Sequence, residues 1–184
     1  MRRNAAGAAI PQLVRGEVTR RRKMQDDRLG RCFRLNETRI LPMTRFHVPQ
    51  IAAIEAATFS APWDEASVLA ELDNPLSLWL VAAEGEEVLG YVGSQTVFED
   101  ADILNVAVLP AARRRGIAEA LMLELERRLR PKGAERITLE VRASNLPALR
   151  LYEKLGYSQV GLRKNYYEKP REDALILQKE LVNP

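Results

Sequence analysis

The chain has 184 residues, 46% of them hydrophobic, which suffices for one substantial core and leaves little room for a second domain. One cysteine and one histidine exclude an internal disulfide and a multi-histidine metal site; they favour a reducing, cytoplasmic location without a metal. No apolar run approaches the roughly 18 residues that a membrane-spanning helix needs, so we expect no membrane association.

Positive charge is concentrated at the N-terminus. Residues 1–36 carry ten Lys or Arg against three Asp or Glu, a net charge of +7, whereas the whole chain carries +3. The remaining residues therefore sum to −4, and overall charge gives no argument for nucleic-acid binding. Because residues 1–31 lack hydrophobic periodicity, we predict a disordered basic extension before a domain at residues 32–184. A weak RNA contact is one role for the extension; a solvated tail or an over-long translation start is the alternative that we favour.

From Cys32 onward, strand and helix patterns alternate, as is typical of the α/β class. His47, the one histidine, is expected at the surface where a helix begins. In the first half of the domain we predict a strand at Arg34–Leu41, a helix at Val48–Thr58 with Ile51, Ile54 and Ala57 on one stripe, a short helix capped by Asp64, and strands at Leu78–Ala83 and Val88–Val97 joined by a turn at Glu84-Gly85-Glu86.

The second half begins with a segment, Ile103–Leu109, that is almost continuously apolar and is therefore predicted to be a buried central strand. The elements expected after it are a helix with Leu121, Leu125 and Leu129 on one face, a strand at Ile137–Val141, a helix at Leu146–Leu155 ended by Gly156, and strands at Tyr157–Leu162 and Ala174–Leu181.

A phosphate-binding turn is indicated between the strand ending at Leu109 and the helix that follows. Gly116 and Ala118 would leave backbone N–H groups open to a pyrophosphate, and the helix N-terminus adds partial positive charge. Neighbouring arginine side chains would add charge-assisted hydrogen bonds. An arginine-rich loop without a ligand is the alternative, but the position between a core strand and a helix favours an anion site.

Two polar residues, Glu140 and Tyr152, form a candidate catalytic pair. Strand alternation turns Glu140 away from its apolar neighbours, and Tyr152 lies two helical turns after Asn145, a plausible helix cap. Acyl transfer to an amine needs a base, donors for the oxyanion and an acid for the leaving thiolate. Glu140, the main-chain N–H of Val108 and Tyr152 are the candidates. Taken alone, however, Glu140 is better explained as an exposed strand carboxylate and Tyr152 as a core aromatic.

Three sequence segments favour the catalytic interpretation instead. V-A-V-L-P-x-x-R-R-R-G-I-A, from Val106, resembles the coenzyme-binding segment of the GNAT acetyltransferases. L-E-V-R-A-S-N, from Leu139, and A-L-x-L-Y-E-K-L-G-Y, from Ala148, are similar to segments of the RimI enzymes within that superfamily. The resemblance covers about residues 33–181. It implies a mixed, mostly antiparallel sheet of about six to seven strands with about four helices, and acetyl-CoA as cosubstrate.

The resemblance also implies residue roles. Glu140 would be the general base and Tyr152 the general acid, while the turn at Gly116 holds the pyrophosphate of acetyl-CoA. Ala118 replaces a glycine of many members, a small change that keeps the space. The residues then expected to contact the coenzyme are Val106, Ala107, Val108, Arg113, Arg114, Arg115, Gly116, Ile117, Ala118, Glu119, Asn145 and Tyr152.

The amine that receives the acetyl group is predicted to be a protein N-terminus. An α-amine has a pKa of about 7.7–8.0 against about 10.4 for lysine, so its neutral form is roughly 300-fold more abundant near pH 7. Further segments resemble the peptide-recognition parts of RimI enzymes, which implies a slot walled by Phe59, Pro62, Trp63, Tyr166 and Tyr167. The alternative to a peptide slot is that Trp63 and Tyr167 simply cover the edges of the hydrophobic core.

Membership in the RimI family implies that the substrate is the N-terminal alanine of a small-subunit ribosomal protein. Three alternatives stay open. They are acetylation of other protein N-termini, acetylation of a small amine such as a polyamine or antibiotic in an acidic pocket, and a non-catalytic module that senses acetyl-CoA or associates with the ribosome through the +7 tail. The pairing of Glu140 with Tyr152 speaks against the last, because a binding module needs neither.

Overall fold

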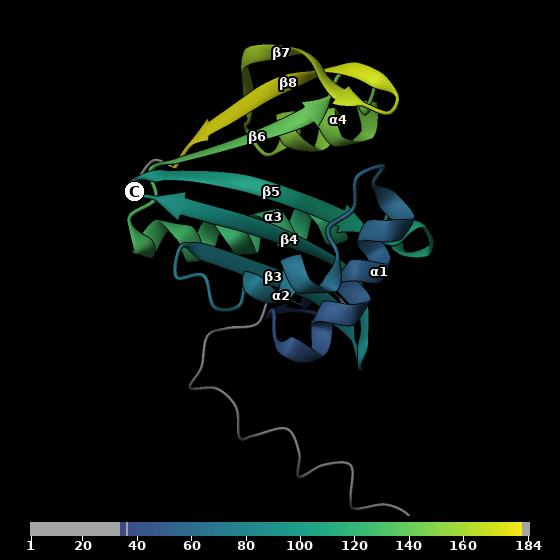
Figure 1. Cartoon of the computed structure of the whole chain (residues 1–184). Coiled ribbons are helices and arrows are strands. Elements are labelled where there is room, and N and C mark those ends of the chain that lie inside the picture. The colour runs from purple at the N-terminus through teal and green to yellow at the C-terminus, as the bar shows by residue number, and fades with distance from the viewer. Residues whose placement is uncertain (1–33, 36, 182–184) are drawn as a thin grey trace, which may run out of the picture. The chain divides into compact units, whose positions relative to one another are not determined.

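The structure is a computed structural model, and it describes residues 34–35 and 37–181 (Figure 1). The predicted basic extension at residues 1–31, with its suggested RNA contact, lies outside the described residues. No helix in the described part of the chain is long and apolar enough to cross a membrane.

A single mixed sheet forms the framework of the domain, in the strand order β1-β2-β3-β4-β5-β6-β8-β7. All neighbouring strands run antiparallel except β5 and β6, which run parallel. The predicted α/β fold with a mostly antiparallel sheet is thus confirmed. The strands are β1 (Arg34–Leu35), β2 (Thr38–Pro42), β3 (Ser77–Glu84), β4 (Glu87–Val97), β5 (Asp100–Val108), β6 (Arg136–Arg142), β7 (Ser158–Glu168) and β8 (Arg171–Glu180).

Helices cover both faces of the sheet. They are α1 (Val48–Thr58), α2 (Glu65–Ala70), α3 (Ile117–Leu129) and α4 (Leu146–Lys154). The first two pack with Trp79 and Val81 in one hydrophobic cluster, whereas α3 and α4 pack with Leu80 and Ala82 in the other. Successive residues of β3 point to opposite faces, so one strand supplies both cores. The predicted leucine stripe of α3 is fully buried, and Asp64 caps α2 through the Ser67 N–H as predicted.

The prediction of one strand at Arg34–Leu41 is wrong. Leu35 pairs with Thr38, so the chain reverses between them and forms the short hairpin of β1 and β2. Residues 36–39 of this segment are all polar, so no apolar alternation marked where the first strand ends and the second begins.

Helix α1 has the predicted bounds but a different buried stripe. Ile51 and Ile54 are buried as expected, whereas Ala57 is exposed and Glu55 takes a buried position. Carboxylates are rarely buried without partners, so hydrophobic periodicity alone passes over such a residue.

The last two strands are longer than predicted. Strand β7 continues beyond Leu162 to Glu168, and β8 begins at Arg171 rather than Ala174. Most side chains of β7 are exposed because it is an edge strand, so its sequence lacks the alternation that marks a half-buried strand. Tyr166 and Tyr167 therefore lie in a strand and not in a loop.

Strand β5 is central, as predicted, but it is not continuously buried. Ile103 and Ala107 are buried, whereas Leu104 and Asn105 between them are partly exposed. The pairing with β4 shifts its register at this place: Gly93 pairs with Asn105, and the next residue of β4 pairs with Ile103. Leu104 is the additional residue on β5, and such a bulge redirects the neighbouring side chains.

Gly93 is required by the aromatic packing beside this bulge. A Cβ atom at Gly93 would lie 2.5 Å from the ring of Trp79. That ring is 4% exposed and stacks on Tyr91, with ring centroids 5.6 Å apart and an interplanar angle of 7°. Trp79 also packs against Trp63 at 5.6 Å, so its ring has no room to withdraw.

We therefore expect Gly93→Ala to lower the free energy of unfolding by about 1–3 kcal/mol, the usual cost of overpacking a core. Chemical denaturation followed by tryptophan fluorescence measures this change. Gly85→Asn is the control: its position has φ +60°, which asparagine tolerates, and a Cβ atom added there would meet no other atom within 4 Å. Equal stability of Gly93→Ala and the parent protein would contradict the packing account.

Candidate active site

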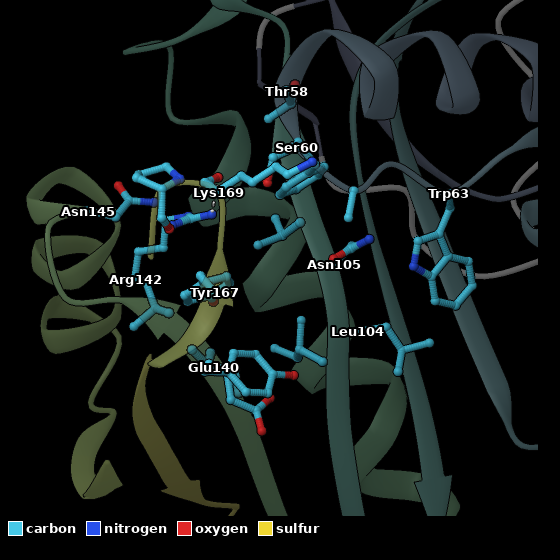
Figure 2. A pocket seen from close by; sticks show the side chains of 18 of the residues that line it. Thr58, Ser60, Trp63, Leu104, Asn105, Glu140, Arg142, Asn145, Tyr167 and Lys169 are labelled. Atoms are coloured by element: carbon cyan, nitrogen blue, oxygen red, sulfur yellow. Dashed lines mark hydrogen bonds between the residues drawn. The ribbon is translucent and has the colours of Figure 1, made fainter. Parts of the chain in front are cut away.

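A pocket of about 420 Å³ opens where β5 and β6 separate. The two strands pair only over Asp100–Asp102 and Arg136–Thr138. Beyond these residues the pocket is lined by Ile103–Val106 on one side and Leu139–Arg142 on the other, with the segment after α1 and the end of β7 as further walls (Figure 2). Four consecutive residues of β5 reach the pocket because the bulge interrupts the alternation of that strand.

Glu140 and Tyr152 line this same pocket. Ile137, Leu139 and Val141 are buried, and Glu140 points to the opposite face of β6, as strand alternation predicted. Its carboxylate lies 3.2 Å from the guanidinium of Arg163, an ion pair that the sequence did not indicate. Both side chains are partly exposed, so the pair contributes little energy and an incoming cation can displace Arg163.

Tyr152 is held on α4 beneath the pocket and is 5% exposed. Burial, and secondarily the nearby Tyr167, raise the pKa of the Tyr152 phenol above its ordinary value. The hydroxyl therefore keeps its proton at neutral pH. Asn145 caps α4 through the N–H of Ala148 at 3.3 Å, as predicted, and also lines the pocket.

Arg142 fixes the end of the β7–β8 hairpin against β6. Its guanidinium donates to the carbonyl oxygens of Lys169 and Pro170 at 3.0 and 3.1 Å, and it lies 4.0 Å from the ring centroid of Tyr167. Burial, together with Tyr166, raises the pKa of Tyr167 to about 12 although Arg142 opposes the shift. Arg142 was not predicted as a site residue, because an arginine at the end of a strand is usually a solvent-exposed surface charge.

Most residues predicted to recognise a peptide come together here. Phe59, Trp63, Tyr166 and Tyr167 all line the pocket, whereas Pro62 does not. Tyr166 and Tyr167 meet edge to face, with ring centroids 5.1 Å apart. Trp63 is drawn at the far side of the pocket from Glu140 in Figure 2, so aromatic rings bound it on two sides.

The predicted coenzyme strand, Val106–Val108, pairs with β4 along one edge only. In the described residues, β6 leaves β5 after Asp102, so the other edge of β5 has no strand partner there. Main-chain N–H and C=O groups along that edge need partners, and an extended amide-containing chain can supply them. Val106 lines the pocket; Ala107 and Val108 lie beyond it.

The predicted phosphate-binding turn leads from the end of β5 into α3. Gly116 is the N-cap residue with φ +77°, a left-handed conformation that glycine adopts without strain, and no side chain caps the helix. The first N–H groups of a helix, here those of Ile117, Ala118 and Glu119, have no partner within it. The arrangement suits a pyrophosphate.

The three predicted arginines have different surroundings. The Arg113 side chain donates to the carbonyl oxygen of Val108 at 3.1 Å, and Arg115 is paired with Glu84. Arg114 is exposed and forms no ion pair with the described residues. The carboxylate of Glu119 is paired with Lys154 at 2.7 Å, which leaves only its main-chain N–H for a phosphate.

One buried polar group beside the pocket was missed by the sequence analysis. Glu55 of α1 is completely buried and accepts hydrogen bonds from Tyr91, Asn105 and the main-chain N–H of Trp63. Asn105 and Trp63 both line the pocket. The only sequence signal was a carboxylate at the i+4 position from Ile51, on the buried face of a helix, where a charged residue is unusual.

Comparison with known proteins identifies the family. Residues 48–157 match the sequence profile of the Acetyltransferase (GNAT) family. A Bacillus subtilis protein, provisionally named a ribosomal protein bS18 alanine N-acetyltransferase, is 40% identical over 131 residues, covering 71% of this chain and 87% of the relative.

Solved structures of N-acetyltransferases have the same fold as this chain. The ribosomal-protein-S18-alanine N-acetyltransferase of Escherichia coli superimposes with a TM-score of 0.73 and 30% identity, over 80% of this chain and 96% of that one. Arabidopsis thaliana NAA60 in complex with acetyl-CoA shares the fold, with a TM-score of 0.72 at 19% identity over 78% of this chain and 98% of that one. The chain is therefore an N-acetyltransferase that belongs to the GNAT family and, within it, to the RimI family.

Proposed function

We propose that this enzyme transfers the acetyl group of acetyl-CoA to the N-terminal amine of a small-subunit ribosomal protein that begins with alanine. The observation that carries the proposal is a pocket that joins an unpaired strand edge, a carboxylate and a neutral phenol between aromatic walls. The names of the relatives in Bacillus subtilis and Escherichia coli support the choice of substrate.

The coenzyme is proposed to lie along the open edge of β5. Its pyrophosphate would contact the first N–H groups of α3 and the free guanidinium of Arg114, and its pantetheine amides would pair with Val106–Val108. The N–H of Val108 would stabilise the oxyanion of the tetrahedral intermediate. The chemistry of the donors supports this assignment, since it offers N–H groups and a cation to an anion.

Glu140 is proposed to accept the proton of the ammonium, directly or through water, so that the neutral amine attacks the thioester carbonyl. Tyr152 is proposed to protonate the departing thiolate. The place of Tyr152 in the same pocket as Glu140 supports this role, since both groups can then reach one bound substrate. The weak pairing of Glu140 with Arg163 leaves the carboxylate available to the ammonium.

The charge of the pocket favours a peptide end over a polyamine. Among its described lining residues, Glu140 is the one carboxylate, while Arg142 and Lys169 are cations. A polyamine site would gather carboxylates to balance several ammonium groups. The aromatic walls instead suit the apolar side chain of an N-terminal alanine and the flat peptide bond after it.

A substrate panel tests the proposal. Purified enzyme with acetyl-CoA is incubated with peptides that begin with alanine, the same peptides with a blocked N-terminus and an internal lysine, and polyamines. We expect a mass increase of one acetyl group on the free-alanine peptides alone, measured by intact mass spectrometry. Acetylation of the polyamines or of blocked peptides in preference would refute an N-terminal specificity.

A pair of variants tests the catalytic roles. Glu140→Gln and Tyr152→Phe should each lower kcat by about 10²-fold or more, because each removes a proton-transfer group, while the affinity for acetyl-CoA stays within about twofold. Steady-state kinetics and calorimetry measure the two quantities.

Matched controls are available on neighbouring elements. Tyr157 is as buried as Tyr152 and its ring lies 5.7 Å away, but it does not line the pocket, so Tyr157→Phe should keep a near-normal kcat. Glu180→Gln removes an exposed carboxylate from β8 and should also be near normal. If Glu140→Gln and Tyr152→Phe match these controls, the assigned roles are wrong.

A further inference from the structure

We propose that Glu55 is a positioning residue that fixes the side chain of Asn105, so that the Asn105 carbonyl oxygen faces the pocket and accepts a hydrogen bond from the α-ammonium group of the peptide substrate. The inference rests on the proposed function, since it assigns a contact to the peptide that the enzyme acetylates. Neither residue takes part in the proton transfers described above.

The contacts of Glu55 carry the first step. Its Oε1 accepts from the Asn105 Nδ2 at 2.7 Å and from the Tyr91 hydroxyl, and its Oε2 accepts from the Trp63 N–H at 3.1 Å. The three donors come from β5, from β4 and from the segment after α1. One carboxylate thus ties together two walls of the pocket, at Asn105 and at Trp63.

The chemistry of a carboxylate fixes which way the Asn105 amide points. An ionised carboxylate only accepts hydrogen bonds, so Asn105 must turn its NH₂ group toward Glu55. Its carbonyl oxygen then points the other way, and Figure 2 shows it on the side of the pocket where Tyr167 and Glu140 lie. The pocket therefore receives a fixed hydrogen-bond acceptor that the Asn105 side chain alone would not guarantee.

The burial of the Glu55 carboxylate costs free energy, which suggests that this residue has a role other than packing. A completely buried carboxylate is expensive to desolvate, and no described residue forms an ion pair with Glu55. A hydrophobic side chain would fill the same place at lower cost if only packing mattered. The three hydrogen bonds that Glu55 accepts give it a use at this position, because they orient the Asn105 amide with its oxygen toward the place where a substrate ammonium would bind.

The test exchanges the acceptor and the donor between the two positions. In Glu55→Gln the main-chain N–H of Trp63 cannot reverse, so the glutamine oxygen must face Trp63 and its NH₂ group must face Asn105. Asn105 then has to flip and presents NH₂ to the ammonium. In the double variant Glu55→Gln/Asn105→Asp, the aspartate accepts from glutamine and offers its second oxygen to the pocket, which restores the arrangement.

We expect Glu55→Gln and Asn105→Ala each to raise the KM for an alanine-first peptide about tenfold, as loss of one charge-assisted hydrogen bond would, and to leave the KM for acetyl-CoA within about twofold. The double variant should return the peptide KM to within about threefold of the parent enzyme. Asn105→Ala truncates a pocket-lining side chain, so it keeps the test informative if Glu55→Gln folds poorly.

Glu71→Gln is the matched control. Glu71 accepts hydrogen bonds from the side chains of Gln95, at 3.1 Å, and Ser77, but it lies outside the pocket, so its peptide KM should equal that of the parent. Single variants with an unchanged peptide KM, or a double variant no better than the singles, would overturn this inference alone. A parent enzyme that acetylates no peptide would instead remove the proposed function and this inference together.

Discussion

The separation of β5 from β6 is the constraint on which the rest of the site depends. After three paired residues the two parallel strands part, and the edge of β5 keeps main-chain groups that no described strand satisfies. A bulge at Leu104 in the same stretch turns consecutive side chains toward the opening. The sheet thereby provides, in one place, an open hydrogen-bonding edge that we propose holds the coenzyme and a pocket that we propose holds the reacting groups.

The two walls of the pocket differ in the groups that they present. The wall formed by β6 and α4 presents the groups that can move protons, Glu140 and Tyr152. The opposite wall is closely packed and hydrogen-bonded: Gly93 allows Trp79 to stack on Tyr91, and Tyr91 donates to Glu55, which also accepts from Trp63 and Asn105. A closely packed wall proposed to hold the peptide, beside a partly exposed carboxylate proposed to act as the base, suits the proposed transfer to a peptide end.

The sequence predicted the elements whose patterns are local. The leucine stripe of α3, the cap at Asp64 and the outward turn of Glu140 depend on neighbouring residues, and the structure has them as expected. Features that depend on pairing between distant strands were missed, among them the bulge at Leu104 and the burial of Glu55, whose partners lie 36 and 50 residues away. Periodicity within one element carries no information on such partners.

Hydrogen exchange gives the most direct test of the central claim, that the open edge of β5 and the start of α3 bind acetyl-CoA together. Amide exchange is followed by mass spectrometry with and without the coenzyme. The account predicts slower exchange in peptides that cover residues 104–108 and 116–120. In the part of the chain that the structure describes, one edge of the first segment pairs with no strand, and the first N–H groups of α3 have no partner within the helix. Coenzyme binding that protects other segments and leaves these two unchanged would contradict it.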